Sequence, residues 1–209
     1  NRIVRSHRIV GWTFKKTDGL GLTDCPDLLK VYSFDEAGLR AAVDDIGDGH
    51  ETSFWHCAAE MTYSYRKMRK SLEFNVSRGL ELLGLCHGLG VARFYYFSTA
   101  FTTNGTGEIR EEIHLTNSPT NAYQASKWLA ETLLSYRARE LGQPLTILRP
   151  GVVIGHHKTG WSTGKPFGAF MFLQAMLELA AMGIEQVKLD IDPLNPAHLL
   201  TIDQLAEWS

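Results

Sequence analysis

The stretch Thr120–Leu134, TNAYQASKWLAETLL, places Tyr123 and Lys127 four residues apart. In a helix this spacing puts both side chains on one face, one turn from each other. An ammonium beside a phenol favours the phenolate and lowers the pKa of the phenol from its usual value of about 10. A phenol tuned in this way is a proton donor suited to carbonyl reduction. The same spacing also occurs in amphipathic helices without a catalytic role, so the neighbouring segments decide what the pair means.

Nearly continuous apolar segments lie on both sides of this helix in the sequence. TSFWHCAAEM (residues 52–61), VARFYYFSTAF (residues 91–101) and LTILRPGVVIG (residues 145–155) each contain a run typical of a buried strand. Helical patterns over about residues 66–87 and 119–141 separate them, and a glycine follows each. This alternation predicts an α/β fold with a doubly wound parallel sheet, which has helices on both faces.

The predicted strands end in small or hydroxyl-bearing residues. Ala58-Ala59, Ser98-Thr99 and Pro150-Gly151 follow the three apolar runs. Ligands of open parallel sheets bind beyond the carboxyl ends of the strands, so we expect these pairs to share one crevice with the Tyr/Lys helix. The alternative for the two hydroxyls is ordinary hydrogen bonding at a strand end.

In this order and spacing the segments resemble the extended short-chain dehydrogenase/reductase superfamily, from about Leu29 to the end of the chain. The motifs that carry the resemblance are HCAA (residues 56–59), FNV (residues 74–76), FSTA (residues 97–100), YQASK (residues 123–127) with the AE that follows it, and LRPGVVIG (residues 148–155). The resemblance implies a Rossmann-like fold and a nicotinamide dinucleotide as the cofactor.

Within that superfamily, the thioester reductases and fatty acyl-CoA reductases, the male-sterility-type NAD-binding branch, look nearest. The residues that carry this closer resemblance are 98–101, 107–109, 121–128 and 154–168. Sugar-nucleotide epimerases and dehydratases share the Tyr/Lys pair and the Arg149-Pro150-Gly151 turn, but they usually place a different loop after the strand-end hydroxyls.

The resemblance implies catalytic roles for three residues. Tyr123 donates a proton to the developing alkoxide, and Lys127 lowers the pKa of Tyr123 and holds the nicotinamide ribose. Thr99 donates a hydrogen bond to the substrate oxygen, with Ser98 as the alternative for this role. No metal is expected, and His156 and His157 are predicted to be loop residues, because no carboxylate or cysteine stands at ligand spacing from them.

The resemblance also implies a set of cofactor-binding residues. These are Ala58, Ala59, Asn75, Ser98, Tyr123, Lys127, Pro150, Gly151 and Val152. The two alanines are small enough for a cofactor to lie against the backbone, and residues 150–152 are expected near the carboxamide. Asn75 supports a link behind Lys127 or, alternatively, caps its helix.

The superfamily opens with a strand and a Gly-rich turn that approaches the pyrophosphate, and we find no such turn. The segment Gly19–Asp24 has aspartate in place of the third glycine and predicts an ordinary loop. We therefore expect the chain to lack the first strand and the phosphate loop. Residues 1–165 are predicted to form a partial dinucleotide-binding domain, and residues 166–209 a helix and a returning strand and helix of an incomplete substrate domain.

The composition limits the partners and the location of the chain. Apolar residues make up 44% and charged residues 21%, with a net charge of −2, so a globular core is expected and nucleic acid is not. One basic cluster, residues 66–70, predicts a solvated helix face, or alternatively a contact with an acidic carrier or a cofactor phosphate. The apolar window 166–184 is interrupted by Gln174 and Glu178, which predicts an amphipathic or buried helix, one that could line an acyl-binding surface, and no transmembrane segment.

Three cysteines, Cys25, Cys57 and Cys86, have no metal-ligand spacing and are odd in number. Free thiols fit a reducing compartment, so a cytoplasmic location is expected, with Cys57 as a small core residue.

The sequence supports three functional hypotheses. The leading one is an NAD(P)H-dependent reductase that converts an acyl thioester on a carrier protein or coenzyme A to an aldehyde or alcohol, with NADP implied and NAD as the alternative. The second is an NAD-dependent sugar-nucleotide epimerase or dehydratase. The third is a non-catalytic Rossmann-like module, because without a phosphate loop the chain itself is expected to bind cofactor weakly. The sequence does not indicate the oligomeric state.

Overall fold

The computed structural model describes residues 9–12, 29–32, 35–47, 51–102, 110–162, 168–188 and 198–208. Strands and helices alternate along these residues, as predicted. The strands are β1 (Ile9–Trp12), β2 (Leu29–Tyr32), β3 (Ser53–His56), β4 (Arg93–Phe97), β5 (Leu145–Leu148), β6 (Val152–Ile154) and β7 (Leu199–Thr201). The α-helices are α1 (Glu36–Ile46), α2 (Met68–Leu72), α3 (Arg78–Gly88), α4 (Ala122–Leu141), α5 (Ala169–Ala181) and α6 (Ile202–Trp208). Shorter helical turns are η2 (Tyr65–Lys67), η3 (Glu73–Ser77) and η4 (Ala100–Thr102).

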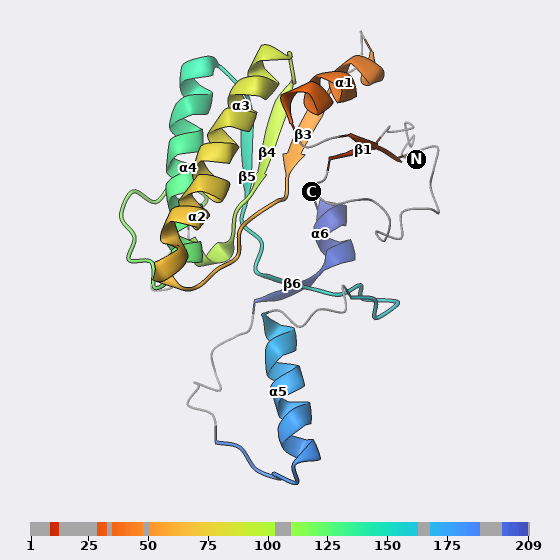
Figure 1. Ribbon diagram of the computed structural model, residues 1–209, viewed down its shortest axis with the longest axis vertical. Helices are drawn as coiled ribbons and strands as arrows, with labels where there is room; N and C mark the ends of the chain where they lie inside the picture. Colours follow the sequence, from red (N-terminus) through yellow and green to blue (C-terminus); the bar gives the residue numbers. More distant parts are fainter. Residues whose placement is uncertain are drawn as a thin grey trace.

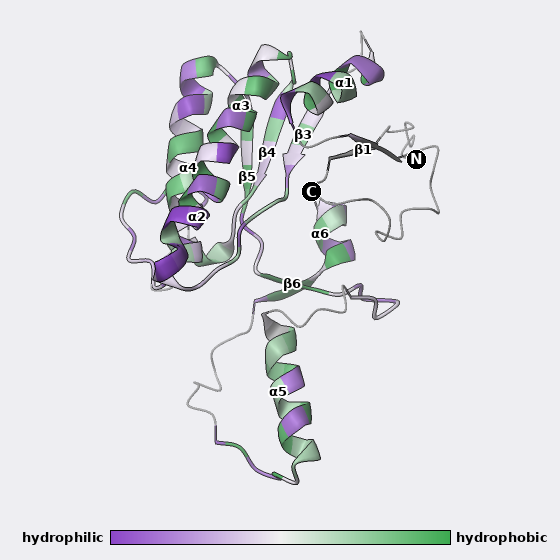
Figure 2. Ribbon diagram, in the orientation of Figure 1, coloured by the Kyte–Doolittle hydropathy of each residue, from purple (hydrophilic) through white to green (hydrophobic). Residues whose placement is uncertain are grey.

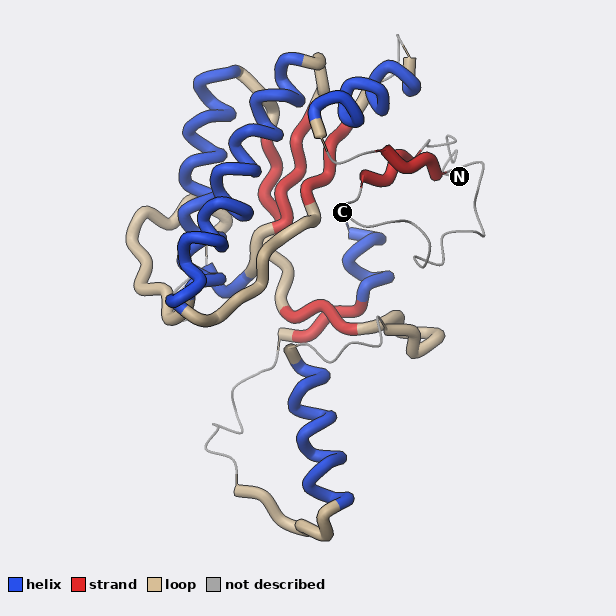
Figure 3. Tube along the Cα trace, in the orientation of Figure 1, coloured by secondary structure: helices blue, strands red, loops and turns tan. Residues whose placement is uncertain are grey.

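All the strand pairs among the described residues are parallel, so the predicted α/β class is confirmed. Figure 3 shows where the strands and helices lie along the trace. The described strands form three short sheets, β1-β2, β3-β4-β5 and β6-β7, in place of one continuous sheet. In the standard doubly wound order the first strand lies between the second and the fourth. If β1 corresponds to the second strand and β3 to the fourth, the position of the first strand lies between the sheet β1-β2 and the sheet β3-β4-β5. No described strand joins these two sheets.

The central sheet packs against one helical layer. Helices α2, α3 and α4 lie side by side on one face of β3-β4-β5, and the carboxyl ends of these strands point toward the bottom of Figure 1. Side chains alternate along the strands, so Phe94 and Tyr96 are fully buried toward the helices. On the opposite face Trp55 stacks on Tyr95, with ring centroids 3.9 Å apart.

Helix α4 has well-defined ends and two distinct stripes. It begins where Asn121 Oδ1 accepts a hydrogen bond from the Gln124 N–H, and it ends at Gly142 in the left-handed conformation. Every fourth residue forms a buried packing stripe, namely Ala122, Ser126, Ala130, Leu134 and Ala138. Because most of these residues are small, α4 approaches α3 closely. The neighbouring stripe carries Tyr123, Lys127 and Glu131.

The helical run that precedes β4 contains a π-helical turn. Residues Glu73–Ser77 form this turn between α2 and α3, and its centre is Asn75. Such turns insert an extra residue into a helix and are frequent at functional sites. The structure therefore places Asn75 within the helix and not at a cap.

Helix α5 projects away from the central sheet (Figure 1), and none of its side chains from Phe170 to Ala181 is fully buried. Figure 2 shows apolar residues around most of its surface, and its two polar residues are Gln174 and Glu178. Leu177 and Phe172 are 71% and 66% exposed. The helix was predicted to be amphipathic or buried, and the second alternative is wrong. No helix within the described ranges is both long and apolar enough to cross a membrane.

A further prediction concerns Cys57. Cys57 is exposed and was wrongly predicted to be a core residue, because the strand alternation turns His56 inward and Cys57 outward. Residues 184–188 have no regular structure. Several predicted features lie outside the described residues: Gly19–Asp24, Cys25 and residues 107–109.

Candidate active site

The ends of β4 and β5 are joined where the predicted crevice should lie. The Ser98 N–H donates to the Leu148 carbonyl at 2.7 Å, and the Ala100 N–H donates to the Pro150 carbonyl at 2.9 Å. Backbone hydrogen bonds therefore fix the strand-end hydroxyls beside the Pro150-Gly151 turn.

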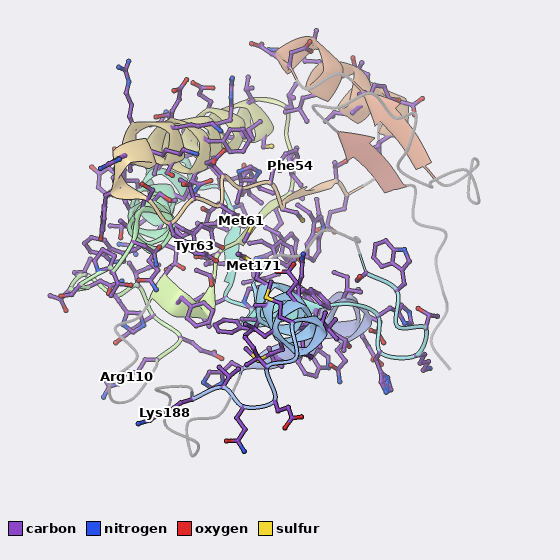
Figure 4. The ribbon with its side chains drawn as sticks, turned by 60° about the horizontal axis from the view of Figure 1, so that its bottom comes forward. Phe54, Met61, Tyr63, Arg110, Met171 and Lys188 are labelled. Atoms are coloured by element: carbon purple, nitrogen blue, oxygen red, sulfur yellow. The ribbon has the colours of Figure 1, made fainter. Side chains whose placement is uncertain are left out.

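The structure brings Thr99 and Tyr123 together. The Thr99 hydroxyl acts on the Tyr123 phenol and partly opposes the rise of its pKa, and Thr99 is almost completely buried. The Ser98 hydroxyl is buried and has no hydrogen-bond partner among the described residues. Thr99, and not Ser98, is thus the strand-end alcohol that contacts the phenol. The ring of Tyr63 meets the ring of Tyr123 edge-on at 6.3 Å, and Figure 4 shows Tyr63 and Met61 on the loop after β3.

Lys127 extends from the same helix face toward the end of β4. Its Nζ donates to the Phe97 carbonyl at 2.6 Å and lies 4.5 Å from the centre of the Tyr96 ring. Burial lowers the pKa of Lys127 to about 8, opposed by the negative charges of Glu131 and Cys57. Lys127 therefore titrates near neutral pH.

The pKa of Tyr123 differs from the expectation. Burial raises it to about 12, and the hydrogen bond from Thr99 opposes this rise only in part. The lowering expected from Lys127 is absent because the ammonium is directed at the Phe97 carbonyl. Tyr123 is consequently a protonated phenol throughout the neutral range.

Asn75 supports the site from behind. Its side chain accepts from the Glu60 N–H at 2.8 Å and donates to the Glu60 carbonyl at 3.0 Å and to Ser126 Oγ at 2.9 Å. These bonds hold the segment that follows Ala58 and Ala59, which are half-buried at the end of β3. Asn75 thus links the two alanines to the residue next to Lys127, and its polar atoms are occupied by protein groups.

A buried ion pair, which the sequence analysis did not identify, lies one turn beyond Lys127. Arg149 Nη2 and Glu131 Oε2 are 2.6 Å apart, and Glu131 is 1% exposed. Arg149 also donates to the carbonyls of Arg110 and Glu112, while Thr102 Oγ1 donates to Glu131 Oε1 at 3.2 Å. The pair therefore ties α4, the end of β5 and the loop after η4 into one unit.

The sequence contained a signal for this pair. Glu131 stands four residues after Lys127, and Arg149 directly precedes the Pro-Gly turn. Both residues belong to the motifs quoted above. They are 18 residues apart in the sequence, and only the fold shows that their side chains are in contact.

A cavity of about 370 Å³ adjoins the Pro150-Gly151 turn. The other residues that line it are Leu148, Arg149, His198, Leu199, Leu200, Leu205 and Trp208. Gly151 is required here, because a Cβ at this position would lie 2.3 Å from the His198 carbonyl oxygen. Val152 lies in β6, where its N–H donates to the same carbonyl. Thr99, Tyr123 and Lys127 do not line this cavity.

Other polar groups near the site are buried without described partners. His56 Nε2 and the Tyr96 hydroxyl belong to this group, and their rings are 5.7 Å apart. Burial, together with the charge of Lys127, lowers the pKa of His56 to about 4, so His56 is neutral at pH 7.

The described residues contain no group of three histidine, cysteine or carboxylate side chains that could hold a metal. His156 and His157 face Asp203, whose Oδ1 accepts from the His157 N–H at 2.8 Å. Asp203 is 46 residues from His157 in the sequence, so the local spacing of residues did not reveal this contact.

Comparison with known families identifies the chain. Residues 49–207, which are well over half of it, match the model of an NAD-binding family described as male sterility protein. The chain belongs to this family. The predicted membership of the extended short-chain dehydrogenase/reductase superfamily is thereby confirmed. No protein with a curated description matches the chain significantly.

Solved structures share the fold of this male sterility family member. UDP-N-acetylglucosamine 4-epimerase from Methanobrevibacter ruminantium M1 aligns with a TM-score of 0.68 and 18% identity, over 96% of this chain and 63% of that one. UDP-glucose 4-epimerase from Thermotoga maritima aligns with a TM-score of 0.61 and 20% identity, over 95% of this chain and 62% of that one. RMD from Pseudomonas aeruginosa, complexed with NADPH, aligns with a TM-score of 0.57 and 19% identity, over 89% of this chain and 65% of that one.

At these identities the likeness shows the fold alone, and that fold is Rossmann-like, as predicted. The chain spans less than two thirds of the length of each of these neighbours.

Proposed function

We propose that this chain is the catalytic part of an NAD(P)H-dependent reductase that reduces an acyl thioester, held on a carrier protein or coenzyme A, to an aldehyde or alcohol. The observation that carries the proposal is the meeting of Thr99, Tyr123 and Lys127 at the end of β4. A hydroxyl, a phenol and an ammonium within one small region form a set suited to a carbonyl oxygen that gains negative charge.

The residues at the strand ends fit a nicotinamide dinucleotide. Ala58 and Ala59 are small and half-buried, the Ser98 hydroxyl has no hydrogen-bond partner among the described residues, and the Lys127 ammonium lies at the carbonyl of Phe97. These residues would hold the cofactor together with Pro150 and Gly151. When bound, the cofactor supplies the hydride. NADP is proposed over NAD because of the reductase resemblance.

The proton chemistry follows from the protonation states. Tyr123, with a pKa of about 12, holds its proton at neutral pH and can donate it to the oxygen that gains charge. Thr99 would orient that oxygen with a hydrogen bond. Lys127, with a pKa of about 8, would bind the ribose hydroxyls and replace the proton that Tyr123 loses.

The decisive experiment replaces Tyr123 by Phe in the full-length protein. NADPH oxidation with an acyl thioester should fall by about 10²- to 10⁴-fold, because a general acid is removed. Calorimetry should show unchanged NADPH affinity, because the aromatic ring remains and only its hydroxyl is lost. Turnover equal to that of the wild type would exclude Tyr123 as the acid.

A sugar-nucleotide epimerase is the second candidate, because two of the structural neighbours named above are UDP-sugar epimerases. Such an enzyme would recycle a tightly bound NAD without net consumption of reduced cofactor. A protein that neither binds NADPH in calorimetry nor releases NAD on denaturation would instead be a non-catalytic module.

A further inference from the structure

A basic surface lies at the start of the helical run that leads into α2. Arg66, Lys67 and Arg69 are all exposed, and within the described part of the chain none of their side chains has an ion-pair or hydrogen-bond partner. Lys70 differs, because its Nζ lies 2.7 Å from Glu60 Oε2. We use the name docking surface for Arg66, Lys67, Arg69 and the groove beside them.

The groove has an apolar floor and an open shape. It has a volume of about 580 Å³, and the residues that line it are Met68, Arg69, Leu72, Glu73 and Ser77. Of the three exposed cations, Arg69 lines the groove, beside the carboxylate of Glu73. Apolar side chains next to exposed cations are typical of a surface that receives an amphipathic segment with acidic residues.

The docking surface is continuous with the candidate active site. Tyr65, at the start of η2, donates from its hydroxyl to the Pro119 carbonyl at 2.6 Å. The Tyr63 carbonyl accepts from the Ala122 N–H, and the Tyr63 ring contacts that of Tyr123. Only two residues separate Tyr63 from Arg66, so a partner on the docking surface would lie close to the segment whose Tyr63 ring packs on Tyr123.

We propose that the docking surface binds an acidic carrier protein, which delivers its acyl thioester to Tyr123. The proposal rests on the proposed function and names the partner of that site. A protein is favoured over nucleic acid because the chain has a net charge of −2 and the surface is small. It is favoured over a flat lipid surface because the cations border a groove.

The test compares two substrates in the full-length protein with NADPH. One is an octanoyl thioester on an acidic acyl carrier protein, and the other is octanoyl-N-acetylcysteamine, which carries no protein. The variant Arg66→Glu/Lys67→Glu/Arg69→Glu should lower kcat/KM for the carrier substrate by about tenfold or more, because charge complementarity governs encounter. The value for the small thioester should not change.

The matched control is Arg137→Glu/Arg139→Glu at the far end of α4. These residues are exposed and lie about 21 and 24 Å along the helix from Tyr123, at 1.5 Å per residue. The control should leave both substrates unaffected. The triple variant should fold, because all three side chains are exposed, and a melting curve equal to that of the wild type checks this.

The outcomes are distinguishable. Equal losses on both substrates, or no loss on either, would overturn the docking surface while leaving the reductase intact. If the wild type reduces neither substrate, the proposed function fails, and fluorescence anisotropy with the acyl carrier protein then decides docking by itself. Binding that is lost in the triple variant and kept in the control supports it. Binding of phosphatidylserine vesicles in place of the carrier, with the same loss in the triple variant, would overturn it in favour of a membrane surface.

Discussion

The layer of α2–α4 on β3-β4-β5 and the peripheral helix α5 use apolar residues in opposite ways. In the first region Leu82, Leu83 and Phe94 are almost completely buried, and they hold the helix that presents Tyr123 and Lys127. In the second region Phe172 and Leu177 are more than half exposed. Apolar side chains are therefore packed in the first region and exposed to solvent in the second. The difference depends on whether another helix or strand covers these side chains, and the following variants compare the two regions.

The largest effect is expected when the buried ion pair is broken. Glu131→Ala should lower the free energy of unfolding by about 3–5 kcal/mol, because Arg149 would remain charged and partly buried without its partner. Urea unfolding followed by circular dichroism measures this loss.

The control for this variant is Glu140→Ala, which removes an exposed pair with Arg137 and should change stability by less than about 0.5 kcal/mol. The double variant Glu131→Leu/Arg149→Met should regain most of the loss. Equal changes in the free energy of unfolding for Glu131→Ala and Glu140→Ala would show that the Glu131–Arg149 pair does not stabilise the fold around the site.

The next effect compares one leucine from each region. Leu83→Ala should cost about 2–5 kcal/mol, because it leaves a cavity in the core, whereas Leu177→Ala should stay within about 0.5 kcal/mol. Chemical denaturation of both variants gives the difference. A large cost at Leu177 would mean that α5 is covered in solution.

A smaller effect should appear at Lys127, with a definite sign. Its folded pKa of about 8 is below the ordinary 10.5, so the unfolded chain binds more protons between these values and stability rises with pH there. Lys127→Met removes this penalty and should stabilise the protein at pH 7 by on the order of 1–3 kcal/mol. The gain should shrink as the pH rises through 8 toward 10.5, and melting curves over this range would show it. A gain independent of pH would contradict the lowered pKa.

The smallest effect concerns Asp203 in the peripheral region. The hydrogen bond from the His157 N–H lowers its pKa to about 2. Its stabilisation is therefore complete above the ordinary pKa of about 3.8 and is lost as the pH falls through about 2. Asp203→Asn should flatten the decline of the melting temperature between pH 4 and pH 2. An unaltered decline would show that this contact has no role in stability.

The sequence predicted much of the fold because the relevant signals are local. Asp35 caps α1 by accepting from the Gly38 N–H at 2.7 Å, and Gly142 ends α4, as their residue types indicate. The convergence of Thr99 and Tyr123 also followed from local patterns, because parallel strands end at one edge of the sheet.

Other features depend on long-range contacts or on burial and could not be predicted. The contact of Glu131 with Arg149 and that of His157 with Asp203 join distant segments. The raised pKa of Tyr123 reflects burial, which the spacing of Tyr123 and Lys127 does not indicate. The outward orientation of Cys57 depends on strand register, where one residue changes the face.

The π-helical turn at Asn75 has a consequence for how the chain can tolerate insertions and deletions. Each residue advances a helix by about 100°, at 3.6 residues per turn. Loss of one residue from Glu73–Ser77 would therefore rotate α3 by that amount relative to α2. Leu82, Leu83 and Cys86 would then leave the sheet, or Asn75 would leave Glu60 and Ser126. The length of this segment is thus fixed by two requirements at once, and single-residue deletions here should be far less tolerated than in ordinary helices.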